Sequence, residues 1–439
     1  MALTVPEPVG GGRLRIGIAG LGTVGAGVVR VLAENAGLIA ARAGVPITVT
    51  AVAARNRGLN RGVDLGGVRW HEDARALADD PDVDVVVELI GGSEGIAREL
   101  VERAIAAGKP VVTANKALLA VHGGALAEAA EAAGVVLGFE AAVAGGIPVI
   151  KALREGLAGN RISRVAGILN GTCNYILTTM RNESKEFGVV LEDAQRLGYA
   201  EADPSFDIDG IDAAHKLAIL AALAFGRQVD FSAVHVEGIR AINALDIRYA
   251  EELGYRIKLL GIARETEAGV EMRVHPAMVP KAALLASVDG VFNAVLAEGD
   301  FVGTVFLQGR GAGAGPTASA VVADLIDIAR GTRIPVWGAA GGQVSEQKML
   351  PISRHHGAYF LRLMVVDQPG VLADVTAILR DHGVSLESML QHGRQPGEAV
   401  AIVLVTHETG EAAIGSAIAG IAKLDAVLTT PALIRIEPS

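Results

Sequence analysis

The stretch Arg13-Leu-Arg-Ile-Gly-Ile-Ala19 has the apolar pattern of a buried strand. It runs directly into Gly20-Leu-Gly22-Thr-Val-Gly25, and a helical pattern follows over Val28-Val-Arg-Val-Leu-Ala33. A strand, a spaced glycine triplet and a helix in this order predict the turn of a dinucleotide-binding fold. A glycine-rich turn that holds no ligand is the alternative interpretation.

Each position of this turn has an expected task. Gly20 permits the tight turn, Gly22 lets the main chain approach a pyrophosphate, and Gly25 lets the helix pack closely on the strand. Thr23 and Val24 stand where the helix begins, and its free N–H groups and positive dipole end suit phosphate. We expect all five residues to contact the cofactor.

The next strand, Ile47-Thr-Val-Thr-Ala-Val-Ala-Ala54, should end beside the adenosine ribose. An NAD site places a carboxylate there to bind the 2′-hydroxyl. This chain has Arg55 and Arg57 instead, and the first carboxylate is Asp64. Because cations suit a 2′-phosphate, the sequence favours NADP(H), with Arg55 as a contact, over NAD(H). The alternative is that both arginines are merely solvated.

Two further strands end in polar residues. Val83-Asp-Val-Val-Val-Glu-Leu-Ile90 leads into Gly91-Gly-Ser93, and Pro110-Val-Val-Thr-Ala-Asn-Lys116 ends in a lysine. The carboxyl ends of parallel strands are where such sheets bind ligands, so Ser93 and Lys116 are candidate cofactor contacts. The alternation of strand and helix patterns from 13 to 147 predicts an α/β doubly wound parallel sheet.

Length and composition set wider limits. The 439 residues correspond to about three domains at roughly 150 residues each. The chain is 51% hydrophobic, but charges interrupt every apolar stretch before the ~18 residues of a membrane span. Residues 1–12 lack the features of a signal peptide. We therefore expect a soluble cytoplasmic protein with no membrane contact.

Charge and cysteine content exclude other classes. The chain has 39 basic and 49 acidic residues, a net charge of −10 with no basic run, which argues against nucleic acid as a partner. Cys173 is the only cysteine, so an intramolecular disulfide and sites that need two thiolates are excluded.

The middle of the chain is rich in carboxylates before a lysine. Gly198-Tyr-Ala-Glu-Ala-Asp-Pro204 is followed by Gly210-Ile-Asp-Ala-Ala-His-Lys216. On a helix Asp212 and Lys216 share a face, so the carboxylate can orient the lysine. A solvated ion pair is the alternative that these two residues alone leave open.

Taken together, the ordered segments resemble the homoserine dehydrogenase family. They are the glycine motif at 20–25, Ala114-Asn-Lys116, Asn170-Gly-Thr172, Tyr199-Ala-Glu201 with Asp203-Pro204, Gly210-x-Asp-x-x-x-Lys216, Gly309-Arg-Gly-Ala-Gly313 and the segment 317–324. The resemblance covers 13 to about 330. It implies a Rossmann domain followed by an α+β catalytic and dimerisation domain.

The family resemblance implies reversible reduction of L-aspartate 4-semialdehyde to L-homoserine by NAD(P)H, a step toward threonine, methionine and isoleucine. By similarity Lys216 is the proton donor, and Lys116 touches both cofactor and substrate. A lysine near the carbonyl oxygen can stabilise its growing charge and supply its proton. Which lysine transfers the proton stays open. Glu201 resembles the residue that binds the substrate ammonium, with Asp207 and Asp212 beside it.

Two further sites are implied by the resemblance alone. Gly313 matches a late contact to the nicotinamide. A structural monovalent cation, usually Na⁺, is bound in this family largely by main-chain carbonyls, and the matching positions are Glu140, Val143, Gly145 and Ile147.

The C-terminal part has a different pattern. Its expected order is βαββαβ, a ferredoxin-like unit, with strands over 359–366, 384–390, 399–406 and 427–436 and helices over 371–381 and 411–422. With Asp367-Gln-Pro-Gly370 it resembles an ACT domain, a regulatory module of amino-acid enzymes. The resemblance implies L-threonine as effector, held at Asp367 and Gly370, and a homodimer or homotetramer.

The predicted organisation has four parts. Residues 1–147 form the cofactor domain, completed by about 305–333, and 148–304 form the catalytic and dimerisation domain. Residues 334–357 form an irregular linker, and 358–439 form the ACT domain. His355 and His356 are adjacent in that linker, where solvated side chains are expected rather than a metal site, because no third ligand is near.

Two other functions are compatible with parts of the sequence. A phosphorylating semialdehyde dehydrogenase would also bind NADP but needs a cysteine nucleophile, for which Cys173 is the only candidate. A non-catalytic amino-acid sensor could also combine a Rossmann domain with an ACT module.

Overall fold

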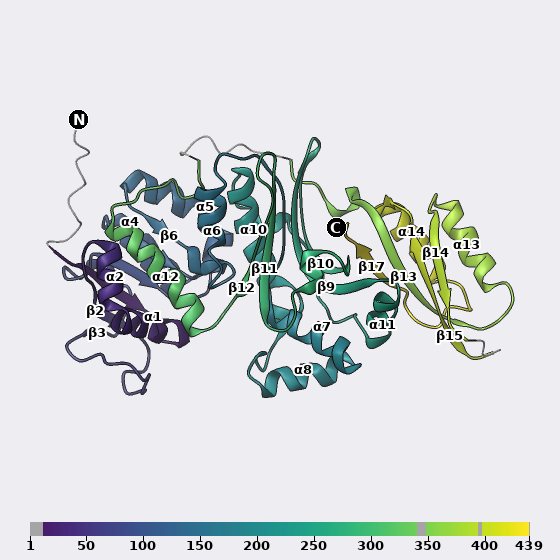
Figure 1. Cartoon of the computed structure of the whole chain (residues 1–439), viewed down its shortest axis with the longest axis horizontal. Coiled ribbons are helices and arrows are strands. Elements are labelled where there is room, and N and C mark those ends of the chain that lie inside the picture. The colour runs from purple at the N-terminus through teal and green to yellow at the C-terminus, as the bar shows by residue number, and fades with distance from the viewer. Residues whose placement is uncertain (1–11, 340–347, 394–396, 439) are drawn as a thin grey trace. The chain divides into compact units, whose positions relative to one another are not determined.

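A computed structural model describes residues 12–339, 348–393 and 397–438 (Figure 1). The chain forms two compact units, each assembled from separate segments. Unit 1 comprises Met1–Leu169, His215–Ser232 and Phe292–Gln347, and unit 2 comprises Asn170–Ala214, Ala233–Val291 and Lys348–Ser439. The domain boundaries given above stay a prediction.

The first part of unit 1 is a Rossmann fold, as predicted. Its six-stranded sheet has the order β3-β2-β1-β4-β5-β6, and every neighbouring pair is parallel. This is the strand order of a doubly wound dinucleotide fold. The strands are β1 (Leu14–Ala19), β2 (Ile47–Ala53), β3 (Arg69–His71), β4 (Val85–Glu88), β5 (Val111–Thr113) and β6 (Leu137–Gly138).

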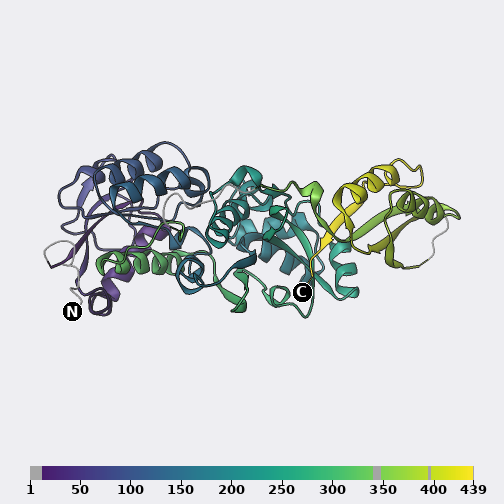
Figure 2. The ribbon, with the colours of Figure 1, turned by 90° about the horizontal axis from the view of Figure 1, so that it is seen from above.

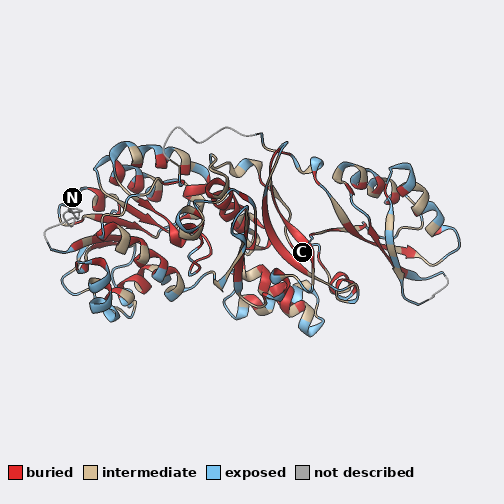
Figure 3. Ribbon diagram, turned by 45° about the horizontal axis from the view of Figure 1, so that its top comes forward, coloured by how far each residue is buried: buried red, intermediate tan, exposed pale blue. Residues whose placement is uncertain are grey.

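Helices cover this sheet and complete its core. They are α1 (Thr23–Glu34), α2 (Ala36–Ala43), α3 (Ala76–Asp79), α4 (Ile96–Ala106), α5 (Lys116–Ala133), α6 (Val149–Lys151) and, from much later in the chain, α12 (Ala314–Ala329). Figures 1 and 2 show α12 beside α1. The two approach closely at Gly27, where a Cβ atom would lie 2.6 Å from the Ala314 oxygen. Strands β1, β4, β5 and β6 are almost wholly buried, whereas the edge strand β3 is not (Figure 3).

Three antiparallel strands of a second, larger sheet also belong to unit 1. Their order is β12-β11-β7, formed by β7 (Ile162–Ile168), β11 (Phe292–Gly299) and β12 (Gly303–Arg310). A π-helix over Ala152–Gly156 links α6 to this sheet.

Unit 2 contains a long hairpin and several helices. Strands β9 (Tyr255–Thr266) and β10 (Gly269–Pro280) pair over their whole length, and the short β8 (His235–Val236) pairs with β10. The helices are α7 (Gly171–Glu183), α8 (Phe187–Arg196), α9 (Ser205–Ile208) and α11 (Ala244–Glu252). Helix α10 (Ile211–Phe225) contributes residues to both units.

The C-terminal part of unit 2 has the predicted ACT architecture. Its sheet has the order β17-β13-β15-β14, and its helices α13 and α14 pack with it around one apolar core. The elements are β13 (His356–Val366), α13 (Val371–Asp381), β14 (Leu386–Gln391), β15 (Ala399–Thr406), β16 (Thr409–Gly410), α14 (Glu411–Ile421) and β17 (Ala432–Ile436). Strand β17 also pairs with β10, in parallel at Ala277 and Arg435, so the ACT sheet continues the hairpin sheet.

The segment predicted as a linker is partly packed. Trp337 is buried against Phe139, with ring centroids 5.3 Å apart, and Met349 forms a β-bridge with Val270. The prediction of solvated histidines is wrong for His355, which is buried 3.7 Å from a carboxylate oxygen of Glu271. Residues 340–347 of the segment lie outside the described residues.

Within the described residues, no single helix has the length and apolar composition of a membrane span. Helices α1 and α2, which are bent by 83° at their junction, pass that test only as a pair.

Candidate active site

The glycine turn between β1 and α1 has three distinct local constraints. Gly20 has φ +95°, and a Cβ atom there would lie 2.5 Å from the Leu89 oxygen. A Cβ atom at Gly25 would lie 2.1 Å from the Gly20 oxygen. Gly22, the N-cap of α1, has open space around its Cβ position. The open space at the Cβ position of Gly22 leaves room for the close approach of a ligand there.

A cavity of about 460 Å³ opens beside this turn. Its lining consists of Gly20, Leu21, Gly22, Ala53, Ala54, Arg55, Asn56, Leu59, Arg61, Glu72, Ala74, Leu89, Ile90 and Ile96. Three predicted cofactor contacts are thus brought together: Gly20, Gly22 and Arg55. The other predicted contacts lie outside this lining: Thr23, Val24, Gly25, Ser93, Lys116 and Gly313.

One cation of this cavity was missed in the sequence. The Arg61 Nε donates to the Leu21 oxygen at 3.0 Å, and the guanidinium lies 5.4 Å from the centre of the Trp70 ring. Arg57 stacks on the same ring at 5.8 Å. The signal was a third arginine in the segment that also carries Arg55.

The carboxyl ends of β4 and β5 are joined by hydrogen bonds. Glu88, fully buried, accepts from the N–H groups of Ile90 and Gly91 at 2.8 and 3.0 Å. Its other oxygen accepts from the Thr113 hydroxyl at 2.6 Å. The sequence predicts Glu88 only as a strand residue, because its Thr113 partner lies on a neighbouring strand.

Both predicted catalytic lysines lie in unit 1. Lys116 is the first residue of α5 and is half-buried, directly after the N-cap Asn115. Lys216, on α10, is 9% exposed, and its Nζ donates to the Leu169 oxygen at 2.8 Å. Burial of an ammonium requires such partners.

In unit 2 two of the predicted carboxylates are held by one amide. Asn170 caps α7 and donates from Nδ2 to Asp207 and to Asp212, at 2.8 Å in each case. The Thr172 hydroxyl lies 3.2 Å from the second oxygen of Asp207. Glu201 is exposed, and its main-chain oxygen accepts from Gln195. The structure therefore groups Asp207 and Asp212 around Asn170.

The lone cysteine is buried. Cys173 has no exposed surface, and its Sγ lies 3.2 Å from the Asp207 main-chain oxygen. A reactive cysteine sits in a partly exposed, electropositive environment. The environment of Cys173 does not match that of a nucleophile.

The segment after β6 is a tight, buried loop. Ala144 and Gly145 both have positive φ, +55° and +49°. A Cβ atom at Gly145 would lie 2.4 Å from the Gly311 oxygen. Glu140 accepts from the N–H groups of Ile150 and Lys151 at 2.9 Å each. Burial raises the pKa of Glu140 to about 7, and nearby Asp324 adds to the effect.

The same loop carries the residues expected to hold the monovalent cation. Val143, Gly145 and Ile147 are buried and follow Glu140 within one loop. Main-chain carbonyl oxygens and a carboxylate are the kinds of donor that a hard cation prefers. The residues present fit the expected group.

At the turn before α13, Gly370 is the N-cap with φ +99°. The N–H of Asp367 donates to Glu398 at 2.8 Å, and its carbonyl accepts from Gly397 at 3.0 Å. The two predicted effector residues therefore bracket one ordered turn.

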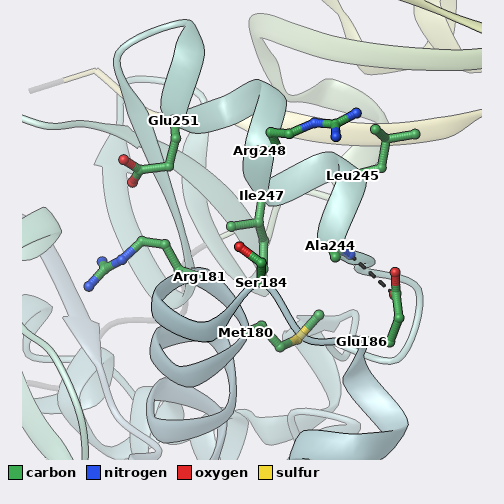
Figure 4. A pocket seen from close by; sticks show the side chains of 9 residues that line it. All are labelled: Met180, Arg181, Ser184, Glu186, Ala244, Leu245, Ile247, Arg248 and Glu251. Atoms are coloured by element: carbon green, nitrogen blue, oxygen red, sulfur yellow. Dashed lines mark hydrogen bonds between the residues drawn. The ribbon is translucent and has the colours of Figure 1, made fainter.

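A separate cavity of about 480 Å³ lies in unit 2 between α7 and α11 (Figure 4). Arg181, Glu186, Arg248 and Glu251 line it, and none of the predicted site residues does. Across the part of the chain that the structure describes, no cluster of three or more His, Cys, Asp or Glu side chains could hold a metal ion.

Comparison with known proteins identifies similar families and relatives. Family models match in order: the NAD binding domain of homoserine dehydrogenase over residues 20–140, homoserine dehydrogenase over 148–326 and the ACT domain over 359–425. The homoserine dehydrogenase of Pseudomonas aeruginosa is 49% identical over 431 residues, 97% of this chain and 99% of that one.

Similar solved structures are also homoserine dehydrogenases. The homoserine dehydrogenase of Thiobacillus denitrificans is 52% identical, with a TM-score of 0.92 over 97% of this chain and 98% of that one. A hyperthermophilic archaeal homoserine dehydrogenase in complex with NADPH is 27% identical, with a TM-score of 0.63 over 73% of this chain and 99% of that one. With its Rossmann NAD-binding domain and C-terminal ACT domain, the chain belongs to the homoserine dehydrogenase family of oxidoreductases.

Proposed function

We propose that this enzyme reduces L-aspartate 4-semialdehyde reversibly to L-homoserine with NADPH, in the cytoplasm, on the route to threonine, methionine and isoleucine. The observation that carries the proposal is Lys216, a buried ammonium on α10 whose Nζ is held by the Leu169 oxygen. Bound NADPH supplies the hydride.

Lys216 is the proposed proton donor to the substrate oxygen, and in the oxidative direction it acts as the base. A positioned ammonium both stabilises the developing alkoxide and supplies its proton. Lys116, at the N-terminus of α5, is the proposed second cation, touching cofactor and substrate. Asp212 lies one turn before Lys216 on α10 and can orient it.

Glu201, Asp207 and Asp212 are proposed to bind the substrate ammonium. Asn170 donates to Asp207 and Asp212 at 2.8 Å each, which supports two oriented acceptors. Glu201 is exposed and accessible to a ligand.

NADP(H) is the proposed cofactor, with NAD(H) as the alternative. The proposed contacts are Gly20, Gly22, Thr23, Val24, Gly25, Arg55, Ser93, Lys116 and Gly313. Arg55 and Arg61 line the cavity beside the glycine turn, where cations favour a 2′-phosphate. Glu72 also lines this cavity, so the charge there is mixed.

A Na⁺ ion is proposed at Glu140, Val143, Gly145 and Ile147. These residues would hold it largely through main-chain oxygens. The strained conformation of Ala144 and Gly145 supports this assignment, and the ion would stabilise the loop without taking part in proton or hydride transfer.

L-Threonine is the proposed effector, bound at Asp367 and Gly370 of the ACT domain in a homodimer or homotetramer. The ordered turn before α13 supports this assignment. We retain the predicted division at about residues 147, 304, 333 and 357 as part of the proposal.

The deciding experiment is NADPH oxidation with aspartate semialdehyde, with and without threonine. Lys216→Met should lower kcat by about 10²–10⁴-fold, the usual contribution of a general acid. Absence of NADPH oxidation by the unmodified enzyme would favour a non-catalytic sensor. Unchanged kcat in Lys216→Met would remove the proposed proton donor.

The alternative phosphorylating dehydrogenase has its own test. Because Cys173 is buried, Cys173→Ala should keep most of the activity. Near-complete loss of activity, or a requirement for phosphate, would favour the alternative.

A further inference from the structure

We propose that Glu88 is a positioning residue, which fixes the loop after β4 and the first turn of α5 as one rigid unit facing the cofactor. The inference rests on the proposed cofactor position at the carboxyl ends of β4 and β5. It concerns a residue that touches neither substrate nor cofactor and acts through its neighbours.

Both carboxylate oxygens of Glu88 accept hydrogen bonds within the protein. One oxygen accepts from the Ile90 and Gly91 N–H groups, and the other accepts from the Thr113 hydroxyl. Glu88 has no exposed surface. A carboxylate so deeply buried is costly unless its oxygens are satisfied, and here three donors satisfy them.

The contacts continue into a closed ring. The Thr113 oxygen accepts from the N–H of Asn115 at 3.0 Å, and the Asn115 Nδ2 donates to the Gly92 oxygen at 2.7 Å. Gly92 follows Gly91, which already donates to Glu88. The ring therefore joins the loop after β4 to the segment after β5 through side chains from both.

Two segments of this ring lie at the candidate site. Ile90 lines the cavity beside the glycine turn, and Asn115 also accepts from Leu118 to cap α5, which begins at Lys116. Gly91 and Gly92 have φ of +88° each. Two successive glycines can adopt many backbone conformations, so the position of this segment depends on its hydrogen bonds to Glu88 and Asn115.

The ring thus couples two features that the reaction needs together: the wall of the cofactor cavity and the position of Lys116. A displacement of about 1 Å in a reacting group can cost about 100-fold in rate. A carboxylate that merely completed the core would affect stability without affecting the cofactor.

The chain offers a matched control at the other end of the same strand. Asp84 precedes β4 and also binds the main chain, accepting from the N–H of Arg15 at 2.8 Å and from its guanidinium at 2.6 Å. It lies at the amino end of the sheet, away from the candidate site. Asp84→Ala should therefore lower the Tm with no change in NADPH affinity.

The experiment compares Glu88→Ala, Glu88→Gln, Thr113→Val and Asp84→Ala in the full-length enzyme. NADPH affinity is measured by its fluorescence without the semialdehyde, kcat and KM by NADPH oxidation, and Tm by calorimetry. We expect Glu88→Ala to weaken NADPH binding about tenfold and to lower kcat/KM about 100-fold. Glu88→Gln, which keeps an oxygen for the two N–H groups, should recover part of both losses.

Thr113→Val cuts the ring while leaving the carboxylate, so it should also weaken NADPH binding. If Glu88→Ala does not fold, Glu88→Gln and Thr113→Val carry the test. The inference is overturned if these variants bind NADPH as tightly as Asp84→Ala does. An unmodified enzyme that neither binds nor oxidises NADPH would instead overturn the proposed function, and the two failures are distinct.

Discussion

Two glycines of the same turn should respond differently to one added methyl group. Gly22 has φ −75° and open space at its Cβ position, so Gly22→Ala should change the free energy of unfolding by less than about 0.5 kcal/mol. It should nevertheless raise KM for NADPH, because the methyl group occupies the approach of the pyrophosphate. Urea unfolding and NADPH titration measure the two effects separately.

Gly25→Ala is the matched variant. Its Cβ atom would lie 2.1 Å from the Gly20 oxygen, so the turn must move, at a cost of about 1–3 kcal/mol. Normal NADPH affinity in Gly22→Ala would show that the pyrophosphate does not pass this residue.

Some functional residues can be predicted from the sequence and others cannot. The glycine triplet could be predicted, because its spacing is typical of one local strand–turn–helix geometry. The roles of Glu88 and Arg61 were not predicted, because Thr113 and the Leu21 oxygen, which they contact, are distant in sequence. His355 was expected in solvent, and its burial against Glu271 follows from packing that no local pattern carries.

Among the elements, those with simple apolar periodicity were predicted best. Helix α13 has the predicted bounds, and β2 differs from its prediction by one residue. The β9–β10 hairpin was missed, because buried charged residues interrupt its apolar pattern. Arg273 is buried there, and the carboxylates of Glu437 and Glu271 accept from its guanidinium at 2.8 and 3.1 Å.

Strand β10 should also make stability depend on pH. Burial lowers the pKa of His275 to about 3; Arg435 and Arg273 also lower it, while Glu437 opposes them. An unfolded histidine takes up its proton near pH 6.5. Between about pH 6.5 and 3 the unfolded chain therefore binds more protons, and stability falls as the pH falls through this window.

His275→Gln should remove that dependence, by at most about 1.4 kcal/mol per pH unit. Glutamine can keep the acceptor for Arg273, which donates to the His275 Nε2 at 3.1 Å. Urea unfolding at pH 7, 6 and 5 measures the slope, and His356→Gln, at an exposed histidine, controls for loss of an imidazole. Parallel curves for the His275 variant and the unmodified enzyme would contradict the prediction.

The ACT module is joined to the hairpin sheet through the pairing of β17 with β10 and is not a separate compact unit. Removal of residues 348–439 would take away β17 from β10, and with it the Glu437 partner of Arg273. It would also remove two main-chain hydrogen bonds of Val270, whose N–H donates to the Lys348 oxygen at 3.0 Å and whose oxygen accepts from the Leu350 N–H at 2.8 Å. We expect the truncated chain to aggregate rather than to become an active, threonine-insensitive enzyme, as measured by soluble yield and Tm.

Asp367→Ala in the full-length enzyme is the control for that truncation, since it changes the proposed effector turn and leaves β17 in place. It should retain the Tm of the unmodified enzyme. A truncated enzyme with normal kcat and solubility would show that the module is separable.

The β10–β17 pairing also bears on synthesis of the chain. Arg273 and its partner Glu437 are 164 residues apart in sequence, and ribosomes add about 5–20 residues per second. An emerging chain therefore spends on the order of 10–30 s with β10 uncovered at Ala277 and Met278, where β17 will pair. During that interval the guanidinium of Arg273 lacks the Glu437 carboxylate and can bind only that of Glu271. Charged side chains on an uncovered strand disfavour its pairing with a neighbouring nascent chain.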